Sequence, residues 1–562
     1  MKTLKTWKKR AALLLAAVMT LVFCMGMTTF AAGTPVTVTV KAPAGTNPTG
    51  MTISAYQVLE QTNENATAGQ ETYEVTTEFA AFFADAEKAY GMLSNPGTIY
   101  VGYENNALTV LGTAEADTIA VSLSKGALDD KYFAADLLSR LDAEQTRIMS
   151  DWLTQYIKAK SIAVSKSTDI WSGSVETGMS AAIEDLDPGF YAIVSSDVPD
   201  GIAIEQSILN TAVATGITLK AETIPITKTV ENNNDSSDTE GENAKAAVGD
   251  ILNYTIKTKV PDLTNYDTEH RDDYKFVISD TMENQELDVD SLQLTINGAT
   301  VTLSDVAAVN PGIYDQGTQT FTITFDVKKL KDGGYSDQEV ILTYSAELMA
   351  EAESINGNKV TLTYSNDPYS DSESGPSDET EVYTYGLDIQ KEFSDGSADY
   401  SKVTFNLRAG SATGTVIEFE GANGVYTKAD SETTSAVTDL KLDPTGSLAL
   451  SGIDGGTYYL GETEAPEDFN PVTVVIKIAA DINDPAKIDL TLSSVKYDDG
   501  TAITPIGSAD QNRIGMSFSV LNQKGFDLPE TGGAGTWMFT IGGIVLIAAA
   551  GGLFLTLRRK SR

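Results

Sequence analysis

Residues 456–466 read Gly-Thr-Tyr-Tyr-Leu-Gly-Glu-Thr-Glu-Ala-Pro, and their alternation indicates the fold. Side chains two positions apart on a β-strand share a face, so Tyr458, Leu460 and Glu462 point the same way. Two of the three are hydrophobic, which makes this the core-facing side and places a carboxyl group within it. We therefore predict a half-buried strand that carries an acid into a hydrophobic core.

Alternation of this kind recurs along most of the chain, whereas helical periodicity is largely confined to one region. Threonine-rich runs with a period of two include residues 36–40, 321–327 and 360–364, and they predict further half-buried antiparallel strands. Apolar residues three and four positions apart occur at 77–92 and 128–160. We therefore expect a mainly β protein whose first domain is α+β, with helices inserted into a sheet.

The exported part of the chain, roughly 500 residues, is too long for a single hydrophobic core. Polar, acidic stretches rich in Gly, Asn and Ser at 231–243 and 369–379 indicate exposed loops. We place domain boundaries near residues 222 and 385. The predicted divisions are a signal peptide (1–32), a mixed N-terminal domain (33–221), two all-β sandwich domains (222–384 and 385–527) and a C-terminal signal (528–562).

The C-terminal signal has three parts. The pentapeptide Leu528, Pro529, Glu530, Thr531 and Gly532 precedes an uncharged run at 537–557, and a basic tail follows. As a helix, the run matches a hydrocarbon core of about 30 Å, and the basic tail stays on the cytoplasmic side. This order resembles the sorting signal of sortase substrates in Gram-positive bacteria. The resemblance implies cleavage between Thr531 and Gly532, so that the helix is a transient membrane anchor.

The N-terminus has the layout of a secretory signal peptide, with a basic start, an apolar stretch at 11–27 and small residues Ala31 and Ala32 near the expected cleavage site. The only cysteine, Cys24, lies inside this segment, so the exported chain has no disulfides, cysteine-ligated metals or thiol nucleophiles. The single histidine, His270, has no second His or Cys to assist it, so we expect no metal site and no catalytic triad. We predict no cofactor.

The exported chain is strongly acidic. All 79 Asp and Glu residues lie between residue 32 and Gly532, the two expected cleavage points, whereas the segments removed there hold 9 of the 39 Lys and Arg residues. The net charge of the remaining chain is 30 − 79 = −49. Such a surface repels nucleic acid, which we exclude as a partner. A solvated acidic surface is the simplest explanation of the charge.

Two predicted strands carry a lysine on their core-facing side. Lys228 is in phase with the Ile and Val residues of 224–230, and Lys391 is in phase with Leu387 and Ile389. A charged amine in an apolar core is costly and burial lowers its pKa, so a buried lysine needs a partner or a reaction. The plain alternative for a single such lysine is a strand-end side chain whose amine reaches solvent.

An acid and an asparagine occupy the same phase in each of these two domains. The acids are Asp280 and Glu462, and Asn366 and Asn522 end what we expect to be the last strand of each domain. A neutral amine is a nucleophile, a carboxamide is an electrophile, and an acid with a raised pKa relays protons to departing ammonia. The product is a Lys–Asn isopeptide bond. Because each bond forms once, we do not expect the protein to be an enzyme.

The residues around these trios resemble two known kinds of domain. Residues 456–466, with Lys391, resemble the E-box and opening strand of collagen-adhesin B-type domains, and residues 248–261, 278–282 and 364–368 resemble the fimbrial isopeptide-forming domain. Together with the sorting signal, the resemblance implies tandem Ig-like, collagen-adhesin-type β-sandwiches in the major backbone pilin of a sortase-assembled pilus.

The resemblance also implies the roles of the trio residues. One crosslink would join Lys228 to Asn366 with Asp280 as the proton shuttle, and Asn356 and Asn358 are alternatives to Asn366. The other crosslink would join Lys391 to Asn522 with Glu462 as the shuttle.

The first domain departs from this pattern. Ser195 falls where Glu462 stands in the last domain, and Lys41 is out of phase with the apolar residues of its strand, so we expect no crosslink there. Lys220 lies in the solvent-facing phase, and the pilin resemblance implies that it accepts the acyl group of Thr531 from another subunit. The usual Tyr-Pro-Lys motif is absent because Leu219 precedes this lysine, and an ordinary surface lysine is the alternative.

The same resemblance implies the partners. They are a pilin-type (class C) sortase, identical subunits joined head to tail, and peptidoglycan attached by a housekeeping sortase, with minor pilins and a host surface ligand as further candidates. The expected location is the cell wall, in a surface pilus. A singly wall-anchored adhesin would share the sorting signal and the sandwiches, and it is the alternative function.

Overall fold

The computed structural model describes residues 35–559 except for 64–70, 92–96, 112–117, 124–131, 205–206, 212–215, 220, 235–239, 265, 267, 269–270, 309–313, 317–318, 367–372, 397–398, 482–483, 510–512 and 526–533. Strands dominate these residues, which confirms the predicted mainly β fold. Contacts divide the chain into two compact units. The first holds residues up to 244, with 251–348 and 356–382, and the second holds 245–250, 349–355 and the chain from 383 onward.

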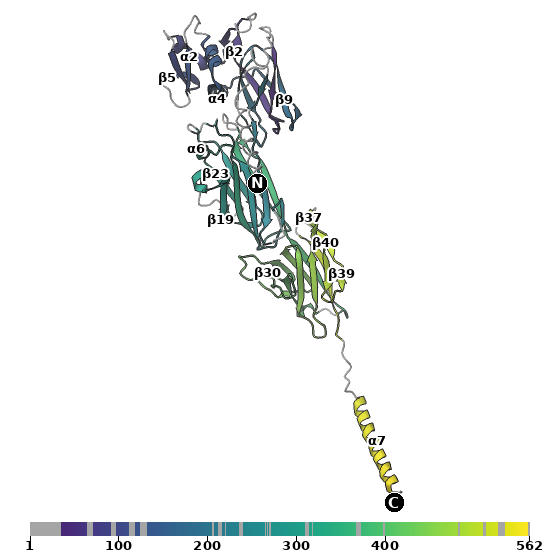
Figure 1. Cartoon of the computed structure of the whole chain (residues 1–562). Helices are drawn as coiled ribbons and strands as arrows, with labels where there is room; N and C mark the ends of the chain where they lie inside the picture. The colour runs from purple at the N-terminus through teal and green to yellow at the C-terminus, as the bar shows by residue number, and fades with distance from the viewer. Residues whose placement is uncertain are drawn as a thin grey trace, which may run out of the picture. The chain divides into compact units, whose positions relative to one another are not determined.

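In its described residues, the first part of the first unit combines helices with four sheets (Figure 1). Its elements are β1 Val36–Lys41, β2 Thr52–Gln61, β3 Tyr73–Val75, α2 Ala80–Gly91, β4 Gly97–Glu104, β5 Ala107–Leu111, β6 Ile119–Leu123, α3 Phe133–Arg140, α4 Ala143–Lys160, β7 Lys166–Thr168, β8 Trp171–Ser174, β9 Gly178–Leu186, β10 Gly189–Ser196, β11 Ile202–Ile204, β12 Ser207–Asn210, β13 Gly216–Thr218 and β14 Ala221–Thr223. The sheet orders are β13-β1-β9-β8, β12-β10-β2-β3 with β7 on β2, β5-β4-β6, and β11-β14.

Strand β10 is buried on both faces of its sheet. Ala192 and Val194 belong to a core that includes helix residues such as Trp152, whereas Tyr191 and Ile193 belong to a second core shared with β1 and β9. Because alternate residues of a strand point to opposite faces, helices cover one face of this sheet and the β1–β9 sheet covers the other. This is the mixed arrangement that the sequence predicts.

The helical stretch predicted at 128–160 contains two separate helices among the described residues. Helix α3 ends at Arg140 and α4 begins at Ala143, because Asp142 caps α4. The Asp142 carboxylate accepts a hydrogen bond of 2.8 Å from the Gln145 backbone, and the Gln145 side chain accepts one of 3.2 Å from the Asp142 backbone. This reciprocal pair is a capping box, which fixes the start of a helix.

The middle part of the chain is a sandwich of two sheets. Its elements are β15 Thr227–Asn232, β16 Asn243–Lys245, β17 Ile251–Lys259, β18 Phe276–Met282, β19 Gln285–Ile296, β20 Ala299–Val301, α5 Leu303–Val306, β21 Ala307–Ala308, β22 Tyr314–Asp315, β23 Thr320–Phe325, α6 Val327–Asp332, β24 Glu339–Leu348, β25 Ile355–Ser365, β26 Glu373–Ser374 and β27 Ser377–Tyr383. The sheet orders are β15-β17-β24-β19-β20 and β16-β27-β25-β18-β23-β21. An edge-to-face contact of 5.1 Å between Tyr344 and Phe321 joins the two sheets.

Two sequence predictions are corrected in this middle part. The run 321–327 does not continue as a strand, because Asp326 accepts a hydrogen bond of 3.0 Å from the Lys329 backbone and caps α6. The stretch 369–379, which the sequence predicts to be a loop, contains β26 and the start of β27. Strand β25 is therefore not the last strand of its sandwich.

The C-terminal part is a second sandwich, followed by a helix. Its elements are β28 Tyr385–Phe393, η2 Tyr400–Lys402, β29 Thr404–Ala409, β30 Phe419–Ala422, β31 Val425–Lys428, β32 Leu440–Lys441, β33 Ser447–Ile453, β34 Gly456–Glu464, β35 Thr473–Ile478, β36 Ala480–Asp481, β37 Asp484–Ile488, β38 Ser494–Tyr497, β39 Ala502–Ile503, β40 Ile506–Ala509, β41 Ile514–Asn522 and α7 Ala534–Arg559. Its two main sheets, β30-β31-β33-β28-β41-β40 and β32-β29-β34-β35-β38-β39, share one hydrophobic core.

Helix α7 contains a segment that is long and apolar enough to cross a membrane. The segment Met538–Arg559 has 22 residues, and an 18-residue window within it has a mean hydropathy of 2.2. By length and composition it corresponds to the apolar run expected at 537–557.

Candidate functional site

Lys228 lies in the interior of the middle sandwich, and its side chain has no exposed surface. Its Nζ donates hydrogen bonds to Asp280 Oδ2, to Asn358 Oδ1 and, at 2.9 Å, to the Tyr344 hydroxyl. Lys228 and Tyr344 come from the sheet containing β15 and β24, and Asp280 and Asn358 come from β18 and β25 of the facing sheet. The cluster therefore brings an amine, an acid and a carboxamide together between two sheets.

Strand register explains why Asn358 is the asparagine in this cluster. In the β18–β25 pair, Asp280 lies opposite Val360, and Met282 lies opposite Asn358. Asn358 is thus the diagonal neighbour of Asp280 on the same face of the sheet, at a separation that side chains can bridge.

The predicted pairing of Lys228 with Asn366 is not what the structure shows. Asn366 follows the end of β25, eight positions beyond Asn358, or about 27 Å along an extended strand. Among the described residues, neither side-chain amide atom of Asn366 has a hydrogen-bond partner, although both are buried. The other alternative, Asn356, accepts a hydrogen bond from Asn284 and donates one to the Val382 carbonyl. The structure therefore places Asn358 against the lysine.

Burial shifts the amine and the acid of this cluster toward their neutral forms. Desolvation lowers the pKa of Lys228 to about 8, and the nearby Asp280 carboxylate opposes this shift. Desolvation also raises the pKa of Asp280, against the effect of the Lys228 amine. A neutral amine has a free lone pair, and a neutral acid has a proton to give, so both forms suit an attack on a carboxamide.

The C-terminal sandwich holds a second cluster. The side chains of Lys391 and Glu462 have no exposed surface, and Lys391 Nζ lies 3.9 Å from Glu462 Oε1. Asn522 Nδ2 donates hydrogen bonds of 2.9 and 2.7 Å to the two carboxylate oxygens of Glu462. The structure thus places Glu462 between the lysine and the asparagine, as the sequence predicts for this trio.

The positions of these three residues follow from the strands that carry them. Strands β28 and β41 are parallel neighbours, with Lys391 opposite Val520 and Phe393 opposite Asn522. Glu462 reaches them from β34 in the other sheet. The second cluster therefore links neighbouring strands of one sheet, whereas the first links two sheets.

Burial has the same electrostatic effect in the second cluster. Desolvation lowers the pKa of Lys391 to about 8, and the carboxylate of Glu462 opposes the shift. Desolvation also raises the pKa of Glu462, and its hydrogen bonds with Asn522 oppose that. The carboxamide oxygen of Asn522 is buried without a hydrogen-bond partner among the described residues.

Several predicted site residues lie outside the described residues. They are the signal peptide (1–32), Lys220, His270 and the pentapeptide Leu528, Pro529, Glu530, Thr531 and Gly532. In the first part of the chain, Lys41 is exposed and Ser195 is buried, and the buried polar side chains described there include no lysine. The expectation that this part forms no crosslink rests on these positions.

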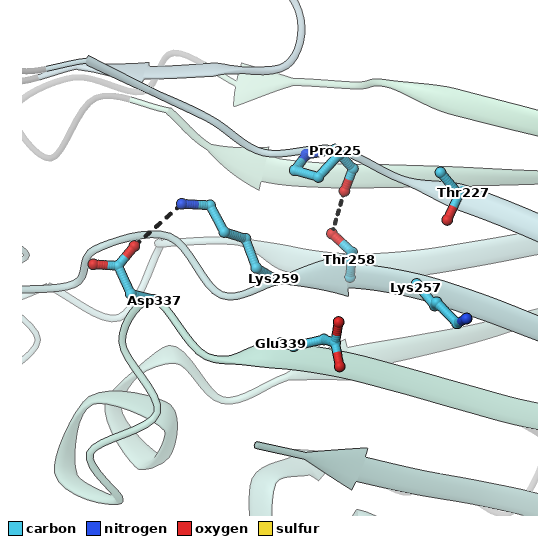
Figure 2. Close-up of a pocket in the computed structure, with 7 residues that line it drawn as sticks. All are labelled: Pro225, Thr227, Lys257, Thr258, Lys259, Asp337 and Glu339. Carbon is cyan, nitrogen blue, oxygen red and sulfur yellow. Dashed lines mark hydrogen bonds and ion pairs between the residues drawn. The ribbon is translucent and has the colours of Figure 1, made fainter. Parts of the chain in front are cut away.

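A shallow pocket occurs elsewhere in the middle sandwich, at the ends of β15, β17 and β24. Figure 2 shows Lys259 directed toward Asp337, at 3.1 Å, and the Thr258 hydroxyl donating to the Pro225 carbonyl, at 2.7 Å. Lys259 also pairs with Glu222. None of the residues that line this pocket belongs to either trio.

The C-terminal segment and the fold both match known proteins. A model of the LPXTG cell wall anchor motif matches residues 521–561. No curated protein is similar enough to this chain to count as a relative. The solved T6 backbone pilin of serotype M6 Streptococcus pyogenes, described as a modular three-domain structure, is 14% identical, with a TM-score of 0.50 over 88% of this chain and 99% of that chain.

The major pilin SpaA of Corynebacterium diphtheriae is 13% identical, and the match covers 87% of this chain and 100% of that chain with a TM-score of 0.44. The LPXTG match and the apolar helix that follows it identify a protein anchored at the cell wall. The chain is therefore a cell-wall-anchored surface protein whose fold is similar to that of a backbone pilin.

Proposed function

We propose that this protein is the shaft subunit of a covalent surface pilus and that its two sandwiches are each locked by a Lys–Asn isopeptide bond. The observation that carries the proposal is the pair of buried clusters, in which a lysine with a lowered pKa meets a buried acid and an asparagine. The anchor signal does not distinguish the two functions, because a singly anchored adhesin can carry it as well. The internal bonds favour the shaft, because a shaft subunit is under tension and bonds of this kind resist its unfolding.

Each bond would form by the same exchange. The neutral lysine nitrogen attacks the carboxamide carbon, the new C–N bond forms, and the old C–N bond breaks with release of ammonia. The acid gives a proton on the leaving side and regains one from the amine nitrogen. Burial excludes water and holds the groups in contact, so the reaction runs once without another enzyme. The protein is its own reagent in this step and does not turn over.

Polymerisation would use the ends of the chain. A pilin-type sortase would cleave after Thr531 and transfer its carbonyl to a lysine of the next subunit, for which we propose Lys220. Repetition gives a head-to-tail polymer of identical subunits, and a housekeeping sortase would join its base to peptidoglycan. The support for this scheme is the LPXTG match and the pilin-like fold.

The function is tested by the sizes of the wall-linked species. Muralytic extracts of wild-type cells are expected to contain a ladder of high-mass species that contain this protein. Lys220→Arg is expected to reduce the ladder to the monomer, and Lys166→Arg, at an exposed lysine in β7, is the matched control that keeps it. A single monomeric species in wild-type walls would instead identify a singly anchored protein. A ladder unchanged in Lys220→Arg would exclude this lysine as the acceptor.

A further inference from the structure

The two clusters differ in how the acid reaches the asparagine. In the C-terminal sandwich, Glu462 accepts hydrogen bonds directly from Asn522 Nδ2. In the middle sandwich, no hydrogen bond among the described residues joins Asp280 to Asn358. The Tyr344 hydroxyl lies between them, donating to Asp280 Oδ1 at 3.0 Å and accepting from Asn358 Nδ2 at 2.9 Å.

The same hydroxyl also contacts the nucleophile. Lys228 Nζ donates to it at 2.9 Å, so Tyr344 touches all three members of the first cluster. An ordinary core tyrosine needs a single partner for its hydroxyl, whereas this one makes three hydrogen bonds to ionisable or reacting groups. The arrangement therefore exceeds what packing requires.

The ring of Tyr344 is held rigidly. Its residue is 2% exposed, and the ring stacks on Tyr254 with centroids 5.0 Å apart and contacts Phe321 edge to face at 5.1 Å. Burial raises the pKa of the hydroxyl well above its usual value, with a further contribution from Asp280. The hydroxyl therefore stays protonated, so it can act by giving up one proton while receiving another, and it cannot serve as a free base.

We propose that Tyr344 is a catalytic residue of the first crosslink, which relays a proton from Asp280 to the leaving nitrogen of Asn358. This inference rests on the proposed isopeptide chemistry and assigns a step in it. Tyr344 connects the acid to the asparagine in the first cluster, whereas Glu462 contacts the asparagine directly in the second.

The relay balances in four moves. Lys228 Nζ attacks Asn358 Cγ, and Nδ2 gains a free lone pair as the carbon becomes tetrahedral. The two hydrogen bonds of the Tyr344 hydroxyl to Asp280 and Asn358 then reverse, because Nδ2 has become an acceptor and the protonated Asp280 is a donor. Tyr344 gives its hydroxyl proton to Nδ2 and takes the carboxyl proton of Asp280. The bond between Cγ and Nδ2 breaks, and ammonia leaves. Asp280 regains a proton from Nζ, which completes the amide, so the tyrosine and the acid both end as they began.

The second cluster supplies an internal control. It lies in the other compact unit, and its proton path does not involve Tyr344. A change at Tyr344 that acts on chemistry must therefore slow the Lys228–Asn358 bond and leave the Lys391–Asn522 bond unchanged in the same molecules.

The test is a time course of both bonds in the full-length protein. Wild-type and Tyr344→Phe chains are pulse-labelled in the producing cells, denatured at intervals and digested, and the two linked peptides are counted by mass spectrometry. Tyr344→Phe is expected to slow the Lys228–Asn358 bond by about 100-fold or more, which is the usual loss when a general acid–base group is removed. The Lys391–Asn522 bond is expected to form at the wild-type rate.

A second buried tyrosine controls for the loss of a hydroxyl. Tyr266 donates a hydrogen bond of 2.6 Å to the Ser365 carbonyl, seven positions along the chain from Asn358. Tyr266→Phe is expected to leave both rates unchanged. If Tyr344→Phe does not fold, 3-fluorotyrosine at position 344 keeps the ring and changes the acidity of the hydroxyl, and it is expected to change the rate of the first bond only.

The outcomes separate the relay from the proposed function. A first bond that forms at the wild-type rate in Tyr344→Phe, or in the fluorotyrosine protein if Tyr344→Phe does not fold, would overturn the relay. A wild-type protein without a Lys228–Asn358 linkage would overturn the crosslink itself.

Discussion

Asn358 accepts a hydrogen bond from the buried amine of Lys228, and it does so from within strand β25, with β26 and β27 still to follow. A bond between these two side chains would enclose residues 228–358 and leave the end of the middle sandwich outside the loop. The alternation of side chains along the strand cannot show whether Asn358 or Asn366 faces Lys228, because both are in the core-facing phase. The register between β18 and β25 can, because it places Asn358 beside Asp280.

Substitution of the two asparagines tests this assignment. Each isopeptide bond releases one ammonia, so a protein with both bonds is lighter than its sequence mass by two ammonia molecules. Asn358→Ala is expected to be lighter than its own sequence mass by only one ammonia, about 17 Da. Asn366→Ala is expected to leave both bonds intact, since its amide atoms make no hydrogen bond within the described chain. Loss of the Lys228 crosslink in Asn366→Ala would contradict the assignment of Asn358 as its partner.

The C-terminal bond should contribute strongly to stability. It would close a loop of 132 residues, from 391 to 522, and the chain-entropy model gives about 5 kcal/mol for a loop of this length. Lys391→Ala is therefore expected to lower the midpoint of thermal unfolding and to increase trypsin cleavage after residue 383. Equal protease resistance in the variant and the wild type would contradict a covalent bond at this site.

Without its bond, the C-terminal sandwich should become more stable as the pH rises. Asn522→Ala leaves the Lys391 amine free, with a folded-state pKa lowered by burial from 10.5 to about 8. Between about pH 8 and 10.5 the amine is protonated in the unfolded chain and neutral in the folded chain, so the free energy of unfolding increases with pH. Below about pH 8 the buried amine must also be protonated, and its full destabilising effect applies. Urea titrations from pH 8 to 10 are expected to show this rise.

The matched control for that pH dependence removes the amine as well. Lys391→Met combined with Asn522→Ala should give a flat profile over the same range. A rise of equal size in both proteins would assign the pH dependence to other groups.

The position of Asn358 also predicts the mechanical response. Tension carried by the two bonds must pass through residues 359–390, which lie outside both loops. At about 3.4 Å per residue, these 32 positions can release at most about 110 Å of chain. Single-molecule stretching is expected to show extensions of this size or less from the two sandwiches, and full unfolding of either one would contradict the bonds.

The three residues of the second cluster could be predicted from the sequence alone. Period-two alternation places Lys391, Glu462 and Asn522 on core-facing sides, and only one asparagine is in phase near the end of the last strand. The structure brings the three side chains together as expected.

The first cluster could be predicted only in part, because phase leaves several candidates equivalent. Asn356 and Asn358 occupy the core-facing phase of β25, and Asn366, just beyond the end of β25, continues the same phase. The pairing of β25 with β18 decides among them. Tyr344 was missed because a tyrosine in an alternating strand has the pattern of an ordinary core residue. Its contacts depend on how two sheets pack, which a single strand's sequence does not encode.

The two proposed isopeptide bonds can be detected by mapping crosslinked peptides in the wall-released protein. We expect one peptide pair joined through Lys228 and Asn358 and another joined through Lys391 and Asn522, each about 17 Da lighter than the sum of its parts. Recovery of all four peptides as separate, unmodified species would contradict both bonds.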